Sequence, residues 1–104
     1  MKRVINKKVY DTETAKLIGE DSYGFPTDFR YWEEELYITK KGNYFIKGEG
    51  GALTSYAVSC GGGSSSGSCI IKPLSKEQAL NWCQEHEIEV NVIEEHFQDM
   101  IEEA

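Results

Sequence analysis

The chain contains no run of apolar residues close to the ~20 that a membrane-spanning helix needs. Its first residues also lack the apolar stretch of a secretory signal peptide. These two absences favour a cytoplasmic protein, in which cysteine side chains stay reduced. Only three cysteines occur among the 104 residues, and an odd number cannot pair completely within one chain. We therefore expect free thiols rather than a disulfide framework.

Positive charge is scarce and unevenly placed. The chain has 11 Lys and Arg against 18 Asp and Glu, a net charge of -7 and a pI near 4.8, which disfavours direct DNA binding. Residues 1–10 hold four basic and no acidic residues, whereas residues 77–104 hold nine acidic and no basic ones. A segment of one sign repels phosphates and attracts basic surfaces. This polarity indicates a basic partner protein.

The N-terminal third has the composition of short strands and tight turns. Residues 4–5 and 9–10 are apolar and flank a polar triplet, which predicts a short hairpin. Asn6 tolerates the left-handed backbone that such a turn needs. Residues 11–14 form a second turn candidate. The polar stretch 19–27, with one Gly and one Pro after residue 23, predicts a loop.

A second hairpin is predicted around the turn cluster 40–43, between strands at 31–39 and 44–46. Side chains of a strand alternate between two faces, so one face of the first strand carries Trp32, Leu36 and Ile38. The other face, which we expect to be solvated, carries Tyr31, Glu33, Glu35 and Tyr37. Glu34 falls on the apolar face by the same alternation and is the one charged residue there.

The rest of the chain divides into a Gly/Ser-rich loop and a helical end. Residues 61–68 contain only Gly and Ser and resemble a linker within a loop. Ser75 and Gln78 fit a capping box, which predicts that a helix begins after Ser75. A second helix start is predicted at residues 91–94. Residues 75–104 are therefore expected to be helical and acidic.

Together these elements predict a single α+β domain over residues 1–104. Its antiparallel sheet, with about four to six strands drawn from residues 1–74, has one or two C-terminal helices packed on one face. The expected core consists of the apolar residues Val4, Ile5, Val9, Leu17, Ile18, Trp32, Leu36, Ile38, Phe45, Ile46, Val58, Ile70, Ile71, Leu80, Cys83 and Phe97.

One set of residues is the clearest candidate for a metal site. Cys60, Cys69, Cys83 and His86 are of the types that bind zinc, but the short two-cysteine knuckle of most zinc sites is absent. We therefore expect no metal, no cofactor and no catalytic residue. Two alternatives stay open: a small metal- or thiol-dependent enzyme, and a DNA-binding regulatory module that uses the basic N-terminal hairpin.

Four segments of the chain resemble a family of small acidic proteins from phages, plasmids and integrative elements of Gram-positive bacteria. They cover most of residues 1–86 and are 1–20 (MKRVINKKVYDTETAKLIGE), 36–51 (LYITKKGNYFIKGEGG), 56–60 (YAVSC) and 73–79 (PLSKEQA). Some small proteins of such elements are similar to anti-CRISPR inhibitors of the type II effector nuclease. The resemblance implies a non-enzymatic inhibitor whose partner is that nuclease or its guide RNA complex, in the cytoplasm of a bacterial host.

An inhibitor of this kind would place acidic groups against the positively charged channel in which an effector nuclease holds nucleic acid. The candidate contacts are two acidic clusters and two tyrosine anchors. They comprise Tyr31, Glu33, Glu34, Glu35, Tyr37, Glu94, Glu95, Asp99, Glu102 and Glu103.

Overall fold

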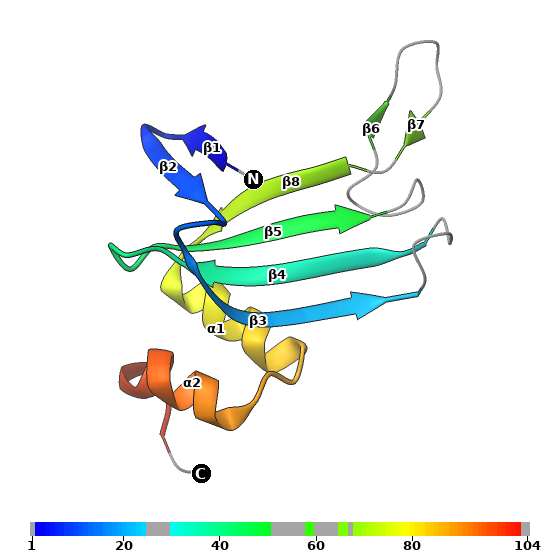
Figure 1. The fold of residues 1–104 in the computed structure, drawn as a ribbon. Helices are drawn as coiled ribbons and strands as arrows, with labels where there is room; N and C mark the ends of the chain where they lie inside the picture. The colour runs from blue at the N-terminus through cyan, green and yellow to red at the C-terminus, as the bar shows by residue number, and fades with distance from the viewer. Residues whose placement is uncertain (1, 25–29, 51–57, 60–64, 67, 103–104) are drawn as a thin grey trace.

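The computed structural model describes residues 2–24, 30–50, 58–59, 65–66 and 68–102. For the described residues between 58 and 69 it describes the backbone alone. In chain order the elements are β1 (Lys2–Ile5), β2 (Lys8–Asp11), β3 (Lys16–Tyr23), β4 (Trp32–Ile38), β5 (Tyr44–Gly50), β6 (Val58–Ser59), β7 (Ser65–Ser66), β8 (Ser68–Leu74), α1 (Lys76–Glu85), α2 (Val90–Phe97) and a 3-10 turn (Gln98–Met100). The helices lie on one side of the main sheet and the β1–β2 hairpin on the other (Figure 1). The predicted α+β architecture is confirmed.

The main sheet has four antiparallel strands in the order β3-β4-β5-β8. The sequence predicts a loop over residues 19–27, and this prediction is wrong for residues 19–23, which extend β3. This polar segment is a strand because its backbone pairs with β4 as far as Tyr23, opposite Trp32. Residues 25–27 lie outside the described residues.

One face of the sheet packs against the helices. Leu36 and Ile46 from neighbouring strands are buried there with Leu80 of α1 and Phe97 of α2. Gly19 faces the same layer, and an added Cβ would lie 3.1 Å from both Ile88 Cδ1 and Trp82 Cζ3. The small residue therefore lets α1 and the following turn approach the edge strand closely.

A second core lies on the opposite face, under the N-terminal hairpin. Tyr10 meets Phe45 edge-on at a centroid distance of 5.4 Å, and Tyr37 stacks on Phe45 at 5.2 Å. Tyr37 is only 8% exposed, so the expectation that it lies on a solvated face is wrong. The β1–β2 hairpin covers this end of the sheet. The alternation of apolar and polar side chains along β4 cannot show that a distant segment packs on its second face.

Half of the predicted core is confirmed. Ile5, Trp32, Ile38 and Ile70 are partly buried, and the Val58 side chain lies outside the described residues. The buried members are Ile18, Leu36, Phe45, Ile46, Ile71, Leu80, Cys83 and Phe97. Val4, Val9 and Leu17 are exposed instead, and those three predictions are wrong. Val4 and Val9 pair across the two-stranded hairpin, which has only one face packed on the sheet. The prediction missed the buried residues Tyr10, Tyr37, Tyr44, Ala79 and Trp82.

The helix starts differ in how well they follow the sequence signals. Ser75 caps α1 through its hydroxyl, which accepts from the Gln78 amide at 3.1 Å, while the Gln78 side chain accepts from the Ser75 amide at 2.9 Å. The predicted capping box is confirmed. α2 begins at Val90 after Glu89, whose side chain makes no capping bond, so the predicted start at 91–94 is displaced.

The β1–β2 turn contains a strained lysine, which generates a stability prediction. Asn6 and Lys7 have φ angles of 52° and 66°, the left-handed pair of a two-residue hairpin turn. A side chain at the second position disfavours this backbone, and glycine does not. We expect Lys7→Gly to raise the free energy of unfolding by about 0.5–1 kcal/mol, measured by chemical denaturation. A lower denaturation midpoint would contradict this description of the turn.

Candidate functional site

Four carboxylates gather on the sheet face that the N-terminal hairpin leaves uncovered. We call this the acidic sheet face; it consists of Glu20, Glu33, Glu35 and Glu49. Glu20 lies directly opposite Glu35 across β3 and β4, and Glu33 lies directly opposite Glu49 across β4 and β5. Like charges in directly opposed positions destabilise a sheet. The arrangement therefore lowers stability while concentrating negative charge.

Two side chains partly offset this charge. The Lys47 ammonium lies 3.4 Å from a Glu35 carboxylate oxygen. The Tyr31 hydroxyl donates a hydrogen bond to the Glu33 carboxylate, and this bond, followed by burial, raises the pKa of Tyr31 to about 12. Tyr31 thus joins the acidic sheet face, as its residue pattern predicts. Tyr37 reaches Glu35 with its hydroxyl at 3.4 Å while its ring stays buried.

Glu34 lies on the opposite face of β4 from Glu33 and Glu35, next to the helices. Its carboxylate Oε1 lies 3.6 Å from His86 Nε2 and accepts a hydrogen bond from Trp82 Nε1 at 3.4 Å. Asp21 Oδ2 lies 2.7 Å from the other ring nitrogen, His86 Nδ1. Glu34 therefore attaches the end of α1 to the sheet and takes no part in the acidic sheet face.

Aromatic contacts complete the surroundings of His86. Its ring stacks on Trp82 at a centroid distance of 4.4 Å and meets Trp32 edge-on at 5.6 Å. In the sequence, His86 stands out only as a candidate zinc ligand. The single clue was Glu34, the one charged residue on the apolar face of β4, which needed a polar partner from another element.

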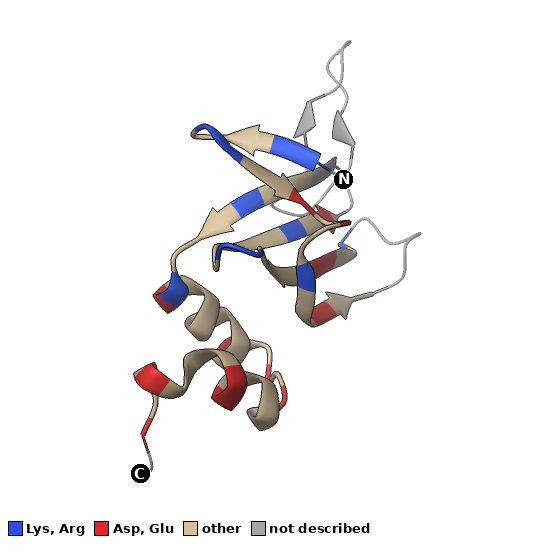
Figure 2. Ribbon diagram, turned by 60° about the vertical axis from the view of Figure 1, so that its left-hand side comes forward, with Lys and Arg blue, Asp and Glu red and all other residues tan. Residues whose placement is uncertain are grey.

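The C-terminal acids form a separate region on the helical side of the sheet (Figure 2). Glu95 lies 3.5 Å from the Lys16 ammonium, and Asp99 lies 2.8 Å from that of Lys76. The hydrogen bond from Lys76 lowers the pKa of Asp99. The remaining predicted contacts here are Glu94 and Glu102, which are exposed, and Glu103, which lies outside the described residues. The predicted acidic contacts thus fall into two regions on opposite sides of the sheet.

The candidate metal and thiol residues do not gather in the part of the chain that the structure describes. Cys83 is fully buried, and burial raises the pKa of its thiol to about 11, which disfavours the reactive thiolate. Both ring nitrogens of His86 face carboxylates. Within the described residues, no three His, Cys, Asp or Glu side chains are placed to hold a metal ion. Cys60 and the Cys69 side chain lie outside those residues.

Comparisons with models of protein families, with curated proteins and with solved structures found no match for this chain. No helix among the described residues is long and apolar enough to cross a membrane.

The Tyr31–Glu33 bond generates a pH prediction. The pKa of Tyr31 is raised from 10.0 to about 12, so the neutral hydroxyl stabilises the folded state fully below about pH 10. This contribution is lost as the pH rises from about 10 to about 12. NMR titration of the Tyr31 ring in wild type and Glu33→Gln measures it. We expect the variant to ionise at lower pH than wild type, and identical titration curves would contradict the bond.

The contacts of His86 generate a stability prediction. His86→Ala removes a stacked ring and leaves the half-buried Glu34 without its imidazole partner. We expect the free energy of unfolding to fall by about 1–3 kcal/mol, measured by urea denaturation. Glu85→Ala, at an exposed position of the same helix, is the matched control and should change it by no more than about 0.5 kcal/mol. Equal losses in the two variants would refute an anchoring role.

Proposed function

We propose that this protein is a non-enzymatic binding protein whose acidic sheet face contacts a basic, nucleic-acid-binding surface of a partner protein. The observation that carries the proposal is the direct opposition of Glu20 to Glu35 and of Glu33 to Glu49. Each such pair opposes folding, by about 0.2–1 kcal/mol, and a basic partner surface would convert the same charges into binding energy.

The acidic sheet face is better suited to this role than the C-terminal acids. Glu95 and Asp99 already have lysine partners within the chain, which neutralise part of the charge on the helical side. On the sheet face Lys47 forms an ion pair with Glu35, whereas Glu33 accepts its hydrogen bond from the neutral hydroxyl of Tyr31, which leaves the charge of Glu33 in place. Strands also hold their side chains on a rigid scaffold, so the carboxylates are ordered before the partner arrives.

The chemistry of the partner follows from the charge and from the resemblance noted above. Effector nucleases of type II CRISPR systems hold nucleic acid in a positively charged channel that recognises a backbone rather than a sequence. A rigid row of carboxylates can take the place of phosphates in such a channel. We therefore propose the type II effector nuclease, or its complex with guide RNA, as the target, in the cytoplasm of a bacterial host.

A matched pair of double variants tests the proposal. Glu33→Gln/Glu49→Gln removes two charges from the acidic sheet face, and Glu94→Gln/Glu102→Gln removes two from the helical side. We expect the first to weaken binding to a purified type II effector nuclease about tenfold or more, since charge-assisted contacts contribute roughly 1.5–3 kcal/mol each. The second should change the affinity less than about twofold, because exposed charges on another face contribute little. Calorimetry measures both affinities, and DNA cleavage by the nuclease reports inhibition.

Stability provides the control for folding. Removing the Glu33–Glu49 repulsion is favourable and weakening the Tyr31 hydrogen bond is unfavourable, so the free energy of unfolding of the first variant should stay within about 1 kcal/mol of wild type. Weaker binding by a protein of unchanged stability identifies the carboxylates as contacts rather than structural groups. An equal loss of binding in both variants, or none in the first, would show that the acidic sheet face is not the binding surface.

A further inference from the structure

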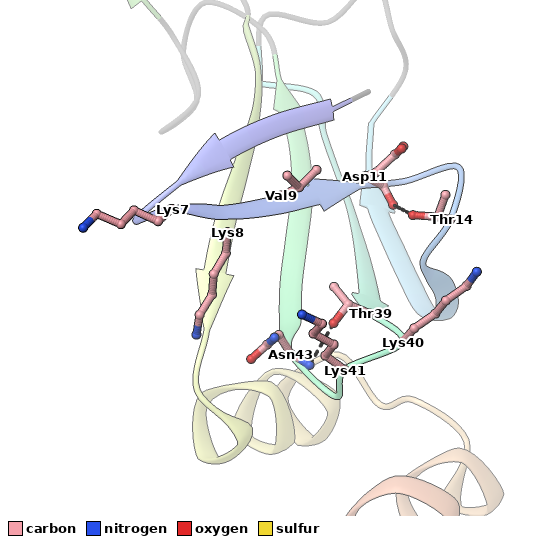
Figure 3. A pocket seen from close by; sticks show the side chains of 9 residues that line it. All are labelled: Lys7, Lys8, Val9, Asp11, Thr14, Thr39, Lys40, Lys41 and Asn43. Carbon is pink, nitrogen blue, oxygen red and sulfur yellow. Dashed lines mark hydrogen bonds between the residues drawn. The ribbon is translucent and has the colours of Figure 1, made fainter.

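A second charged surface, of opposite sign, lies at the other end of the molecule. A cavity of about 560 Å³ opens between the tip of the β1–β2 hairpin and the β4–β5 turn. Lys7 and Lys8 line it from the hairpin, and Lys40 and Lys41 line it from the turn. Asn43 lies between these two pairs of lysines (Figure 3). Two segments far apart in the sequence thus bring four ammonium groups to one groove, which we call the lysine groove.

The lysines of the groove differ from most others in the chain. Within the described part of the structure none of the lysines in the groove forms an ion pair. Ion pairs with an Asp or Glu are instead formed by Lys2, Lys16, Lys47 and Lys76. One carboxylate, Asp11, also lines the groove, but its Oδ2 pairs with Lys2, which lies outside the groove, and its Oδ1 accepts a hydrogen bond from the Glu13 amide at 2.9 Å. In a chain with 18 acidic residues, the charge of the groove is left unneutralised.

Lys7 supplies an independent observation. It occupies the second position of the hairpin turn with a φ of 66°, where glycine is the unstrained choice. Residues held in this region cluster at functional sites. Within the described residues the Lys7 side chain forms no hydrogen bond and no ion pair, and it adds one positive charge to the groove.

The layout of the four charges indicates the shape of the ligand. Lys7 and Lys40 extend toward opposite ends of the groove, with Lys8 and Lys41 between them (Figure 3). A single phosphate would need converging donors, whereas a row of separated cations matches a chain of regularly spaced anions. The neutral side chains of Thr39 and Asn43 in the lining can contact phosphate and sugar oxygens.

We propose that the lysine groove binds the phosphate backbone of double-stranded nucleic acid without reading its sequence. None of the described residues that line it is aromatic, so the groove has no platform on which unpaired bases could stack. A duplex presents its phosphates outward and keeps its bases stacked inside. This surface is separate from the acidic sheet face, so the protein can hold a nucleic acid through one end and a basic protein through the other.

Fluorescence anisotropy with a labelled DNA duplex of about 20 base pairs, at low salt and with no partner protein present, tests the proposal. Lys8→Gln/Lys41→Gln removes two charges from the groove. Lys16→Gln/Lys72→Gln removes two outside it and is the matched control. We expect the groove variant to bind at least about tenfold more weakly than wild type, and the salt dependence of log K to fall by about 0.9 for each lysine. The control should change the affinity less than about twofold.

Four results would overturn the proposal. They are no binding by wild type, equal weakening by both variants, tighter binding of a single strand of the same length, and equally effective competition by a polyglutamate peptide. The last would identify a site for acidic proteins instead. Because no partner protein is present, failure here leaves the proposed role of Glu33 and Glu49 untouched, and the binding test of those residues does not involve the groove.

Discussion

The structure depends on the burial of apolar side chains on both faces of the four-stranded sheet. β4 shows this within two residues, since Leu36 packs under the helices and Tyr37 packs under the N-terminal hairpin. Full burial of a large apolar side chain contributes roughly 1.5–3 kcal/mol. That contribution exceeds the cross-strand repulsion of one carboxylate pair, about 0.2–1 kcal/mol. The double-sided core therefore allows the same sheet to hold an acidic face.

The extent of the hairpin determines where that face lies. Tyr10 covers the end of the sheet where Phe45 and Tyr37 are stacked. Farther along the same strands the side chains facing this way include Lys47 and the carboxylates of Glu33, Glu35 and Glu49, beyond the reach of the hairpin. The hairpin thus buries one half of the face and leaves the other to solvent, and its tip supplies two of the four lysines at the covered end. The two charged surfaces are consequences of one packing arrangement.

Much of the fold could be predicted because local signals and tertiary contacts agree. The Ser75–Gln78 capping box and the alternation of Trp32, Leu36 and Ile38 required no knowledge of distant residues. The polar stretch 19–23 was misjudged because its strand is held by pairing with β4 rather than by propensity. Lys76 and Asp99 are 23 positions apart in the sequence, and His86 and Asp21 are 65 apart. The spacing of apolar residues within one helix or strand cannot reveal such contacts.

The candidate site was predicted in part for the same reasons. The parity of Glu33 and Glu35 placed them correctly on one face with Tyr31. The carboxylates directly opposite them, Glu20 and Glu49, come from adjacent strands whose register is a tertiary property. The lysine groove combines two turns that the sequence identified separately. Their proximity arises only when the hairpin folds over the sheet.

The most direct test of the account is a hydrogen–deuterium exchange footprint of the protein bound to a type II effector nuclease. If the acidic sheet face is the binding surface, exchange slows at the end of the sheet around Glu20, Glu33 and Glu49, and the amides of α2 exchange as in the free protein. Protection centred on α2, or no stable complex with the nuclease, would contradict it.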